Sequence, residues 1–522
     1  MKHIVICSDG TGNTAVKRRG TNVFKLYEAV DFEGHRTDPD HRVRQIGFYD
    51  DGVGTSRLKL LAALGGALGI GLGRNVRQLY ADLARVYDPG DRIFLFGFSR
   101  GAFTARTLSG LIATCGIIDR HHPGCTSDDE LRSRVTQAYR AYRDRYRTRL
   151  MQVFRGKASD KPESAVKIRT QWAVQHQGHR AGFEPWQVPI AFIGVWDTVD
   201  AVGFPVPWIA DLWNETFYRF KFPDHVLGPM VERARHALAI DDERHTFHPL
   251  IWDEAPKANG AASAASVQDP DRIKQVWFSG VHSNVGGGYP KQGMSVVSLT
   301  WMMDEAEQPR TLADGTTVAG LRFSPGDRQL YHERQNVYDK LYDSRAGASF
   351  FYRYLPRDID RFCREHRLPP RVHVSVLERC LDAPEGYAPG NVPRGAEIVG
   401  QAVPIVASTL DHMRTELGKR SSVLDSVRGL IVLRRVAYVV LIGVALLVII
   451  MALANARWHL SEVSVTGLLT AVGRFVFHAV KGSRWWIIGL LLAMLAAYVA
   501  NWLLTRKMKH IYSTFWFRVR PH

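Results

Sequence analysis

Short apolar runs alternate with segments of helical periodicity over about the first 300 residues of the chain. The helical spacing of apolar side chains predicts helices over 73–87 and 101–116. Uninterrupted apolar runs predict strands over 3–7, 43–49, 92–98, 188–196 and 273–281. Runs of this kind are typical of strands that a parallel sheet buries on both faces. The alternation predicts an α/β fold, with a mostly parallel sheet and helices on both of its faces.

Two longer apolar segments near the C-terminus differ in kind from these strands. Residues 436–454 and 485–504 comprise 19 and 20 residues without a charged side chain. At about 1.5 Å per residue, a helix of either length spans the roughly 30 Å hydrocarbon core of a bilayer. We therefore predict a transmembrane helical hairpin, with two buried core helices as the alternative. The connection includes 465–480, whose amphipathic pattern is typical of a segment that lies in the interface.

The distribution of basic residues favours one orientation of this hairpin. Arginine and lysine cluster before the first apolar segment and after the second, whereas those in the connection are more widely spread. Since cytoplasmic flanks are enriched in these residues, we expect both ends in the cytoplasm. The N-terminal sequence MKHIVICSDG lacks the apolar region of a signal peptide, so the first domain is also expected there. The flanking basic residues are Arg428, Arg434, Arg435, Arg506, Lys507 and Lys509.

Composition and charge indicate which class of molecule the protein is expected to bind. The chain has 522 residues, of which 46% are hydrophobic and 23% charged, as in a globular protein with more than one structural unit. Its formal net charge of +17 favours anionic surfaces. No zinc-finger spacing or aromatic–basic RNA-binding pattern accompanies this charge, so we expect acidic lipid headgroups and no nucleic acid. The five scattered cysteines have no C-x-x-C spacing and are predicted to be free thiols.

Three segments stand outside the regular pattern. Residues 254–270 are small and polar and are predicted to form a surface loop. Residues 311–324 place Asp-Gly between two β-favouring stretches, which indicates a hairpin. Residues 130–150 are predicted to be helical, with their basic side chains on a solvated face rather than against lipid.

The most specific chemical motif is Gly97-Phe98-Ser99-Arg100-Gly101, between a predicted strand and a predicted helix. A nucleophilic serine must stand clear of the sheet, so that a histidine and a substrate can both reach its Oγ. A sharp strand–turn–helix elbow achieves this, and flanking glycines avoid collisions at the turn. The helix N-terminus directs the N–H of Arg100 toward a developing oxyanion. We predict Ser99 as a nucleophile rather than a tight-turn serine.

The acid and the base are expected at the ends of later strands, in the chain order Ser, Asp, His. Asp197 directly follows one predicted strand, and His282 directly follows another. We predict Asp197 as the acid, with Asp200 as the alternative. His282 is the predicted base, and the alternatives, His245 and His248, have no strand leading into them.

A second oxyanion donor is expected from the turn Asp9-Gly10-Thr11 after the first strand. Small residues let backbone N–H groups approach a ligand, so we predict the N–H of Gly10 or Thr11, with an ordinary Asp-Gly turn as the alternative. Asp9 would organise this turn or bind a metal. The glycine-rich stretch 64–75 lacks a phosphate-binding register and is expected to form a flap, and 49–55 is expected to line the cleft. The predicted chemistry requires no metal or organic cofactor.

The chain resembles the DUF2235 family, the Tle1-like catalytic domain of type VI secretion phospholipase effectors, in the motifs SDGTGN, YDDGVGT, GFSRGAFTAR, GVWDTVDAVG, DDERHTFHP and WFSGVHSNVGGGY. The resemblance covers about residues 1–395. It implies an α/β-hydrolase fold, a triad that falls on Ser99, Asp197 and His282, and phospholipase activity on bacterial membranes. Asn284 stands where the family often has Asp, and the C-terminal hairpin is not a shared part of its catalytic domain.

These features predict a membrane-anchored serine hydrolase of lipid esters, specifically a phospholipase. The predicted units are a catalytic domain over 1–395, a helical linker over 396–435, two membrane helices within 436–510 and a basic tail over 511–522. The expected location is the bacterial inner membrane, and the expected partners are anionic phospholipids. The alternatives are an inactive membrane-tethered binding or signalling module, and an esterase that acts on a soluble ester or thioester.

Overall fold

The computed structural model describes most of the chain. The strands are β1 Lys2–Ser8, β2 Arg44–Asp50, β3 Arg92–Phe98, β4 Ile190–Trp196, β5 Val231–Ala239, β6 Ile273–Phe278, β7 Arg310–Thr311, β8 Thr317–Val318, β9 Arg371–His373 and β10 Glu397–Val399. The described residues are 1–10, 20–34, 43–52, 71–146, 152–153, 162–176, 184–200, 225–254, 269, 271–311, 315–346, 352–393, 395–400, 407–420, 423–455, 470, 473–474, 477 and 485–520.

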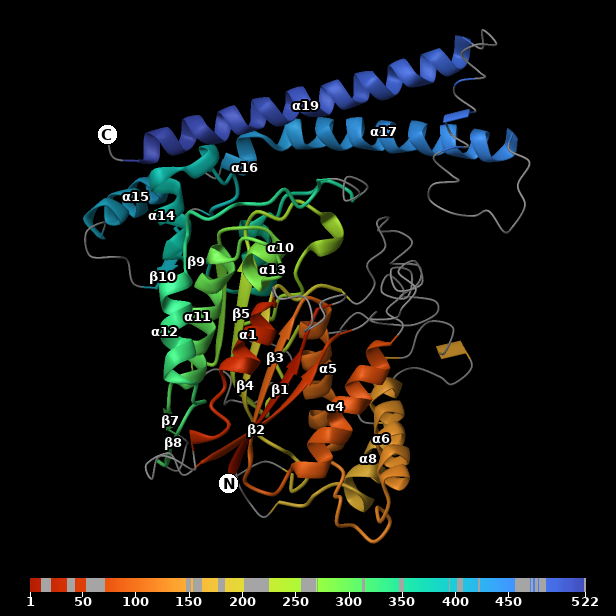
Figure 1. Cartoon of the computed structure of the whole chain (residues 1–522), viewed down its shortest axis with the longest axis vertical. Coiled ribbons are helices and arrows are strands. Elements are labelled where there is room, and N and C mark those ends of the chain that lie inside the picture. Colours follow the sequence, from red (N-terminus) through yellow and green to blue (C-terminus); the bar gives the residue numbers. More distant parts are fainter. Residues whose placement is uncertain are drawn as a thin grey trace.

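A parallel sheet of eight strands forms the centre of the molecule (Figure 1). Its strand order is β10-β9-β6-β5-β4-β3-β1-β2, and every neighbouring pair is parallel. The carboxyl ends of all these strands therefore meet at one edge of the sheet, where α/β proteins place their sites. The prediction of an α/β fold built on a parallel sheet is confirmed. A separate antiparallel pair, β7 and β8, forms the predicted hairpin.

Helices cover both faces of the sheet. One face is covered by α4, α5, α6 and α8, and the other by α1 and α11, each with its own apolar core (Figure 1). The helices are α1 Asn22–Ala29, α4 Leu72–Val86, α5 Arg100–Cys115, α6 Asp128–Arg143, η1 Asp144–Tyr146, α8 Glu163–Gln171, η2 His245–Phe247, α10 His282–Gly286, α11 Gly293–Glu307, α12 Pro325–Arg334, α13 Ile359–His366, α14 Val374–Asp382, η5 Pro384–Gly386, α15 Ala407–Lys419, α16 Val423–Ser426, α17 Arg428–Asn455 and α19 Trp485–Val519.

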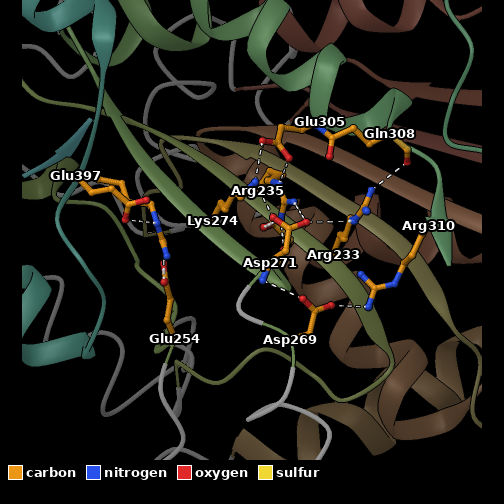
Figure 2. A network of polar contacts seen from close by, with 12 residues as sticks. Arg233, Arg235, Glu254, Asp269, Asp271, Lys274, Glu305, Gln308, Arg310 and Glu397 are labelled. Carbon is orange, nitrogen blue, oxygen red and sulfur yellow. Dashed lines mark hydrogen bonds and ion pairs between the residues drawn. The ribbon is translucent and has the colours of Figure 1, made fainter. Parts of the chain in front are cut away.

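Strand β5 lies in the middle of the sheet, and the apolar pattern did not predict it. Charged side chains interrupt its sequence, VERARHALA, so no continuous apolar run marks it. The buried Arg235 guanidinium donates to Glu305 at 2.6 Å and to Asp271 at 3.0 Å, within the network of alternating charges in Figure 2. Buried charges are tolerated when they are paired and hydrogen-bonded, and this pairing exists only after β5, β6 and α11 have come together.

Two long apolar helices, α17 and α19, lie side by side and antiparallel at the carboxyl edge of the sheet (Figure 1). Both are long and apolar enough to cross a membrane by length and composition. Arg434 of α17 donates from Nε to Asn501 Oδ1 of α19 at 3.0 Å. The exposed large apolar residues of the pair are Val432, Leu433, Val436, Val439, Val440, Leu446, Leu447, Ile450, Trp485, Trp486, Leu492, Leu495, Tyr498, Val499, Trp502, Leu503 and Phe517.

The last turns of α19 pack against the part of the molecule that contains the large sheet. The side chains of Trp516 and Val519 are fully buried among residues that follow the sheet, and Trp516 Nε1 donates to the Pro389 carbonyl at 2.7 Å. Residues 511–519, assigned to a basic tail from sequence, thus continue α19 into a core. Strand β10 likewise adds residues 397–399 to the sheet, beyond the expected limit at 395.

Several smaller expectations can be compared with the structure. The basic segment from 130 is helical in α6, and all five cysteines are buried free thiols. The loop expected over 254–270, the flap expected over 64–75 and the interfacial segment expected over 465–480 lie wholly or largely outside the described residues.

Candidate active site

Ser99 occupies a sharp turn between β3 and α5. It is the N-cap of α5 and has a φ of 58°, a left-handed conformation that a non-glycine residue rarely adopts. Its backbone N–H donates to the Trp196 carbonyl at 3.0 Å, which ties the turn to the end of β4. A Cβ on Gly97 would lie 2.5 Å from the Gly101 carbonyl oxygen, and one on Gly101 would lie 2.0 Å from that of Ser8. The two glycines are therefore required by close backbone approach.

Three polar side chains from the carboxyl ends of different strands meet beside this turn. His282 Nε2 lies 2.8 Å from Ser99 Oγ, and His282 Nδ1 lies 2.5 Å from Asp197 Oδ2. Ser99 follows β3, Asp197 follows β4 and His282 begins α10 after β6. All three are buried. The imidazole thus connects the serine hydroxyl to the carboxylate in the order that general-base activation requires.

The carboxylate of Asp197 is held by a second cation that the sequence did not indicate. Arg357 is 0% exposed and donates to Asp197 Oδ1 at 2.6 Å and to Oδ2 at 2.9 Å. The same guanidinium donates to the Phe247 carbonyl at 2.5 Å and to the Ala239 carbonyl. Burial alone would raise the pKa of Asp197, but Arg357 and His282 outweigh it and hold that pKa well below its usual range. Asp197 is therefore ionised at neutral pH.

The imidazole of His282 sits between aromatic rings and a carboxylate. Its ring centroid lies 4.7 Å from that of Phe98 and 5.1 Å from that of Phe247. Its backbone N–H donates to Asp242 Oδ2 at 3.2 Å. Burial lowers the pKa of His282 more than the Asp197 carboxylate raises it. His282 is therefore neutral at neutral pH, the state in which Nε2 can accept a proton.

The turn after β1 is organised by the carboxylate of Asp9. This buried group accepts from the Gly10 N–H at 2.5 Å, the Thr21 hydroxyl at 2.6 Å and the Tyr49 hydroxyl at 2.6 Å. The sequence left two roles open for Asp9, to organise the turn or to bind a metal. The three donors to its carboxylate favour the first of these roles. Thr11 lies outside the described residues, and the Gly10 amide already has a carboxylate acceptor. Within the described part of the chain, no three acidic, histidine or cysteine side chains are grouped so that they could hold a metal.

Residues 2–305 match the family described as "T6SS, Phospholipase effector Tle1-like, catalytic domain". The match covers more than half of the chain and includes Ser99, Asp197 and His282. The chain belongs to this family. The family resemblance expected from the sequence is thereby confirmed.

Two further similarities are more distant. The uncharacterized protein YEL023C of Saccharomyces cerevisiae is 26% identical over 270 residues, which are 49% of this chain and 33% of that protein. The match thus spans about a third of the length of this curated relative. An uncharacterized protein from Pseudomonas aeruginosa, known from a crystal structure, is 20% identical over 63% of this chain and 47% of its own, with a TM-score of 0.32.

The alternatives to Asp197 and His282 lie elsewhere around the site. Asp197, not Asp200, hydrogen-bonds to the His282 imidazole. His248 Nε2 lies 2.9 Å from the Leu355 carbonyl, and burial lowers its pKa to about 3. His245 stacks edge-on against His248, with their ring centroids 5.3 Å apart.

Two residues of the site were missed from sequence, and a third has a clearer role than expected. Asp242 lies in the motif DDERHTFHP, which was considered only for its histidines. Arg357 lies beyond residue 305, and no pattern distinguishes it among the 68 lysines and arginines. Asn284 donates from Nδ2 to the Lys340 carbonyl at 3.0 Å, a contact that an aspartate carboxylate could not make.

Proposed function

We propose that the protein is a serine hydrolase that cleaves carboxylic esters of phospholipids. The observation that carries this proposal is the continuous hydrogen-bonded chain from Ser99 Oγ through His282 to Asp197, at 2.8 and 2.5 Å. The backbone strain at the nucleophile is what an elbow serine requires. Membership in a family of phospholipase effector domains supports a phospholipid as the substrate.

In the proposed reaction Ser99 Oγ attacks the ester carbonyl carbon while His282 Nε2 accepts the hydroxyl proton. The charge on Asp197 stabilises the imidazolium that forms. The tetrahedral oxyanion would accept from the Arg100 N–H at the start of α5, and such a donor contributes about 3–4 kcal/mol. The second donor is proposed to be the N–H of Gly10 or Thr11, and the Gly10 N–H would have to leave the Asp9 carboxylate to serve. His282 then returns the proton to the leaving alcohol, and water repeats both steps on the acyl-enzyme. No step needs a metal or an organic cofactor.

The apolar pair α17 and α19 supports a membrane anchor. Its apolar side chains face outward from the protein, which suits lipid better than water. We propose that the pair crosses the bacterial inner membrane with the catalytic domain on the cytoplasmic side, as the flanking basic residues favour. The site edge of the sheet faces this pair, so the anchor would hold the site near its substrate (Figure 1). The net positive charge supports anionic phospholipids as partners.

The decisive experiment combines a nucleophile variant with an activity-based probe. In detergent-solubilised full-length protein, a fluorophosphonate should label Ser99, and Ser99→Ala should abolish both labelling and phospholipid hydrolysis while it leaves thermal unfolding unchanged. Ser109→Ala, a buried serine of the same helix, is the matched control and should be labelled normally. An unlabelled wild type would favour the inactive binding module. Hydrolysis of short soluble esters without any of phospholipid vesicles would favour the soluble esterase.

A further inference from the structure

One basic side chain of the apolar pair α17 and α19 points into the protein. Arg434 lies two residues before the apolar segment 436–454, where a basic residue is expected to face lipid headgroups. Its side chain is buried instead, with 7% of the residue exposed, whereas Arg428 of the same helix and Lys507 of α19 are exposed. Because burial of a charge is costly, the partners of Arg434 should indicate what its side chain does.

The guanidinium of Arg434 contacts α19 and two segments outside the apolar pair. Its Nε donates to Asn501 Oδ1 of α19 at 3.0 Å. Its Nη1 lies 3.7 Å from Glu243 Oε2, and its central carbon lies 3.6 Å above the ring of Tyr354, which is 0% exposed. The Tyr354 hydroxyl in turn donates to Met508 Sδ of α19 at 3.9 Å. Arg434 therefore joins both helices of the pair to residues 243 and 354.

The two segments that Arg434 contacts are also bound to each other. The Leu355 N–H donates to the Glu243 carbonyl at 2.8 Å, and the His245 N–H donates to the Arg353 carbonyl at 2.9 Å. These bonds make residues 243–245 and 353–355 a short antiparallel pair. A displacement of one segment would therefore displace the other.

Each of these segments leads to a residue that holds part of the candidate triad. Asp242, which directly precedes the glutamate beside Arg434, accepts from the backbone N–H of His282 at 3.2 Å. Arg357, three residues after the tyrosine beneath Arg434, donates to both oxygens of Asp197 at 2.6 and 2.9 Å. The contacts of Arg434 thus lie one and three residues from the groups that hold the base and the acid.

We propose that Arg434 is a positioning residue of the active site, which holds Asp197 and His282 in place through the segments 243–245 and 353–355. This inference rests on the proposed function of Ser99 as the nucleophile. Proton transfer and attack depend on alignment, and a misplacement of about 1 Å can cost about 10²-fold in rate. Docking of α17 and α19 would then complete the active site as well as anchor the protein.

The test compares Arg434→Gln, Arg434→Lys and Lys507→Gln in detergent-solubilised full-length protein. Hydrolysis of a fluorogenic phospholipid in mixed micelles gives kcat and KM, and a soluble fluorophosphonate gives the rate of labelling at Ser99. Arg434→Gln should lower kcat by about 10- to 100-fold, and KM by no more than about twofold in either direction, because the lost contact affects alignment rather than substrate binding. The labelling rate should fall by the same factor as kcat.

Two variants separate the charge of Arg434 from its position near the membrane. Arg434→Lys keeps a cation beside Glu243 and should recover kcat to within about threefold of the wild type, although it loses the planar stacking on Tyr354. Lys507→Gln removes an exposed basic charge from the neighbouring helix and should behave as the wild type.

Thermal unfolding of every variant shows whether it is folded. If Arg434→Gln unfolds because Glu243 loses its cation, the double variant Arg434→Gln with Glu243→Gln, in which both charges are absent, takes its place. The double variant should show the same loss of kcat and of labelling rate.

The outcomes distinguish this inference from the proposed function. A wild type that is not labelled at Ser99 would overturn the proposed function and this inference with it. A labelled wild type and a folded Arg434→Gln of equal kcat would overturn this inference alone. It would also be overturned by a raised KM with unchanged labelling, which would assign Arg434 to lipid access, or by an Arg434→Lys variant as slow as Arg434→Gln.

Discussion

Replacing Arg357 with glutamine tests whether the charge of Asp197 is controlled from outside the triad. In the structure Arg357 donates to both oxygens of Asp197, at 2.6 and 2.9 Å, and is 0% exposed. Glutamine keeps some of the volume but removes the positive charge. The Asp197 carboxylate would then remain buried, with His282 and the Ala239 N–H as its donors.

The size of the effect follows from these contacts. Two charge-assisted hydrogen bonds contribute about 1.5–3 kcal/mol each, and removal of one partner of a buried ion pair costs about 3–5 kcal/mol. At about 1.36 kcal/mol per pH unit, this loss would raise the pKa of Asp197 by roughly two to four units. In the wild type, the lowered pKa of Asp197 means that its ionised carboxylate stabilises the folded state above about pH 4. That contribution to the free energy of unfolding is lost as the pH falls through the pKa that Asp197 has in the folded protein. A rise of this size from well below the usual range returns the pKa of Asp197 toward its usual value of about 3.9, so in Arg357→Gln the carboxylate begins to be protonated near pH 4.

The assay is kcat/KM for a fluorogenic phospholipid in mixed micelles, measured from pH 4 to 9. Protonated Asp197 cannot stabilise the imidazolium, and loss of that charge in a comparable triad costs about 10⁴-fold. The deficit of Arg357→Gln should therefore be largest at low pH and shrink as the pH rises. Arg357→Lys, which keeps the charge, should recover part of the rate, and Arg361→Gln, whose side chain is 68% exposed, should behave as wild type. A deficit that is the same at every pH, or no deficit, would refute this account of Arg357.

Three further predictions concern the candidate active site and the packing of the protein around it. Because burial lowers the pKa of His282, the acid limb of the wild-type kcat/KM profile should have its midpoint below about 6.5; a midpoint above 7 would contradict the neutral resting imidazole. Asn284→Asp should lower the free energy of unfolding by about 1–3 kcal/mol in chemical denaturation, since a carboxylate would face the Lys340 carbonyl that now accepts from Nδ2; unchanged stability would contradict that contact. Trp516→Ala should cost about 3–5 kcal/mol by the same measurement, whereas the exposed Trp485→Ala should cost little; equal effects would show that the end of α19 is not part of the core.

Much of the site follows from one regularity of the sequence. Ser99 and Asp197 directly follow the apolar strands β3 and β4, and His282 lies four residues beyond the end of β6. Because parallel strands end at the same edge of the sheet, residues at those positions gather there whatever the loops between them do. Gly97 and Gly101 can also be predicted from the sequence, because the sharp turn at Ser99 leaves no room for a side chain at either position.

The groups that tune the site could not be found in this way. Arg357 and Asp242 carry no local pattern, and their effects arise from buried contacts with Asp197 and His282, 160 and 40 residues away along the chain. Strand β5 was missed for a related reason. Its charges look exposed in sequence, and only the partners supplied by β6 and α11 permit their burial.

The amino-acid pattern alone determined the parallel sheet, the two apolar helices and the three residues at the strand ends, because alternation, length and position relative to a strand are local properties of the chain. Tertiary structure decided which buried charges would be neutralised, and that the end of α19 would join a core rather than form a tail. Those outcomes depend on which distant groups come within a few ångströms of each other, and the strength of a buried charge or contact is set by that distance and by the exclusion of water.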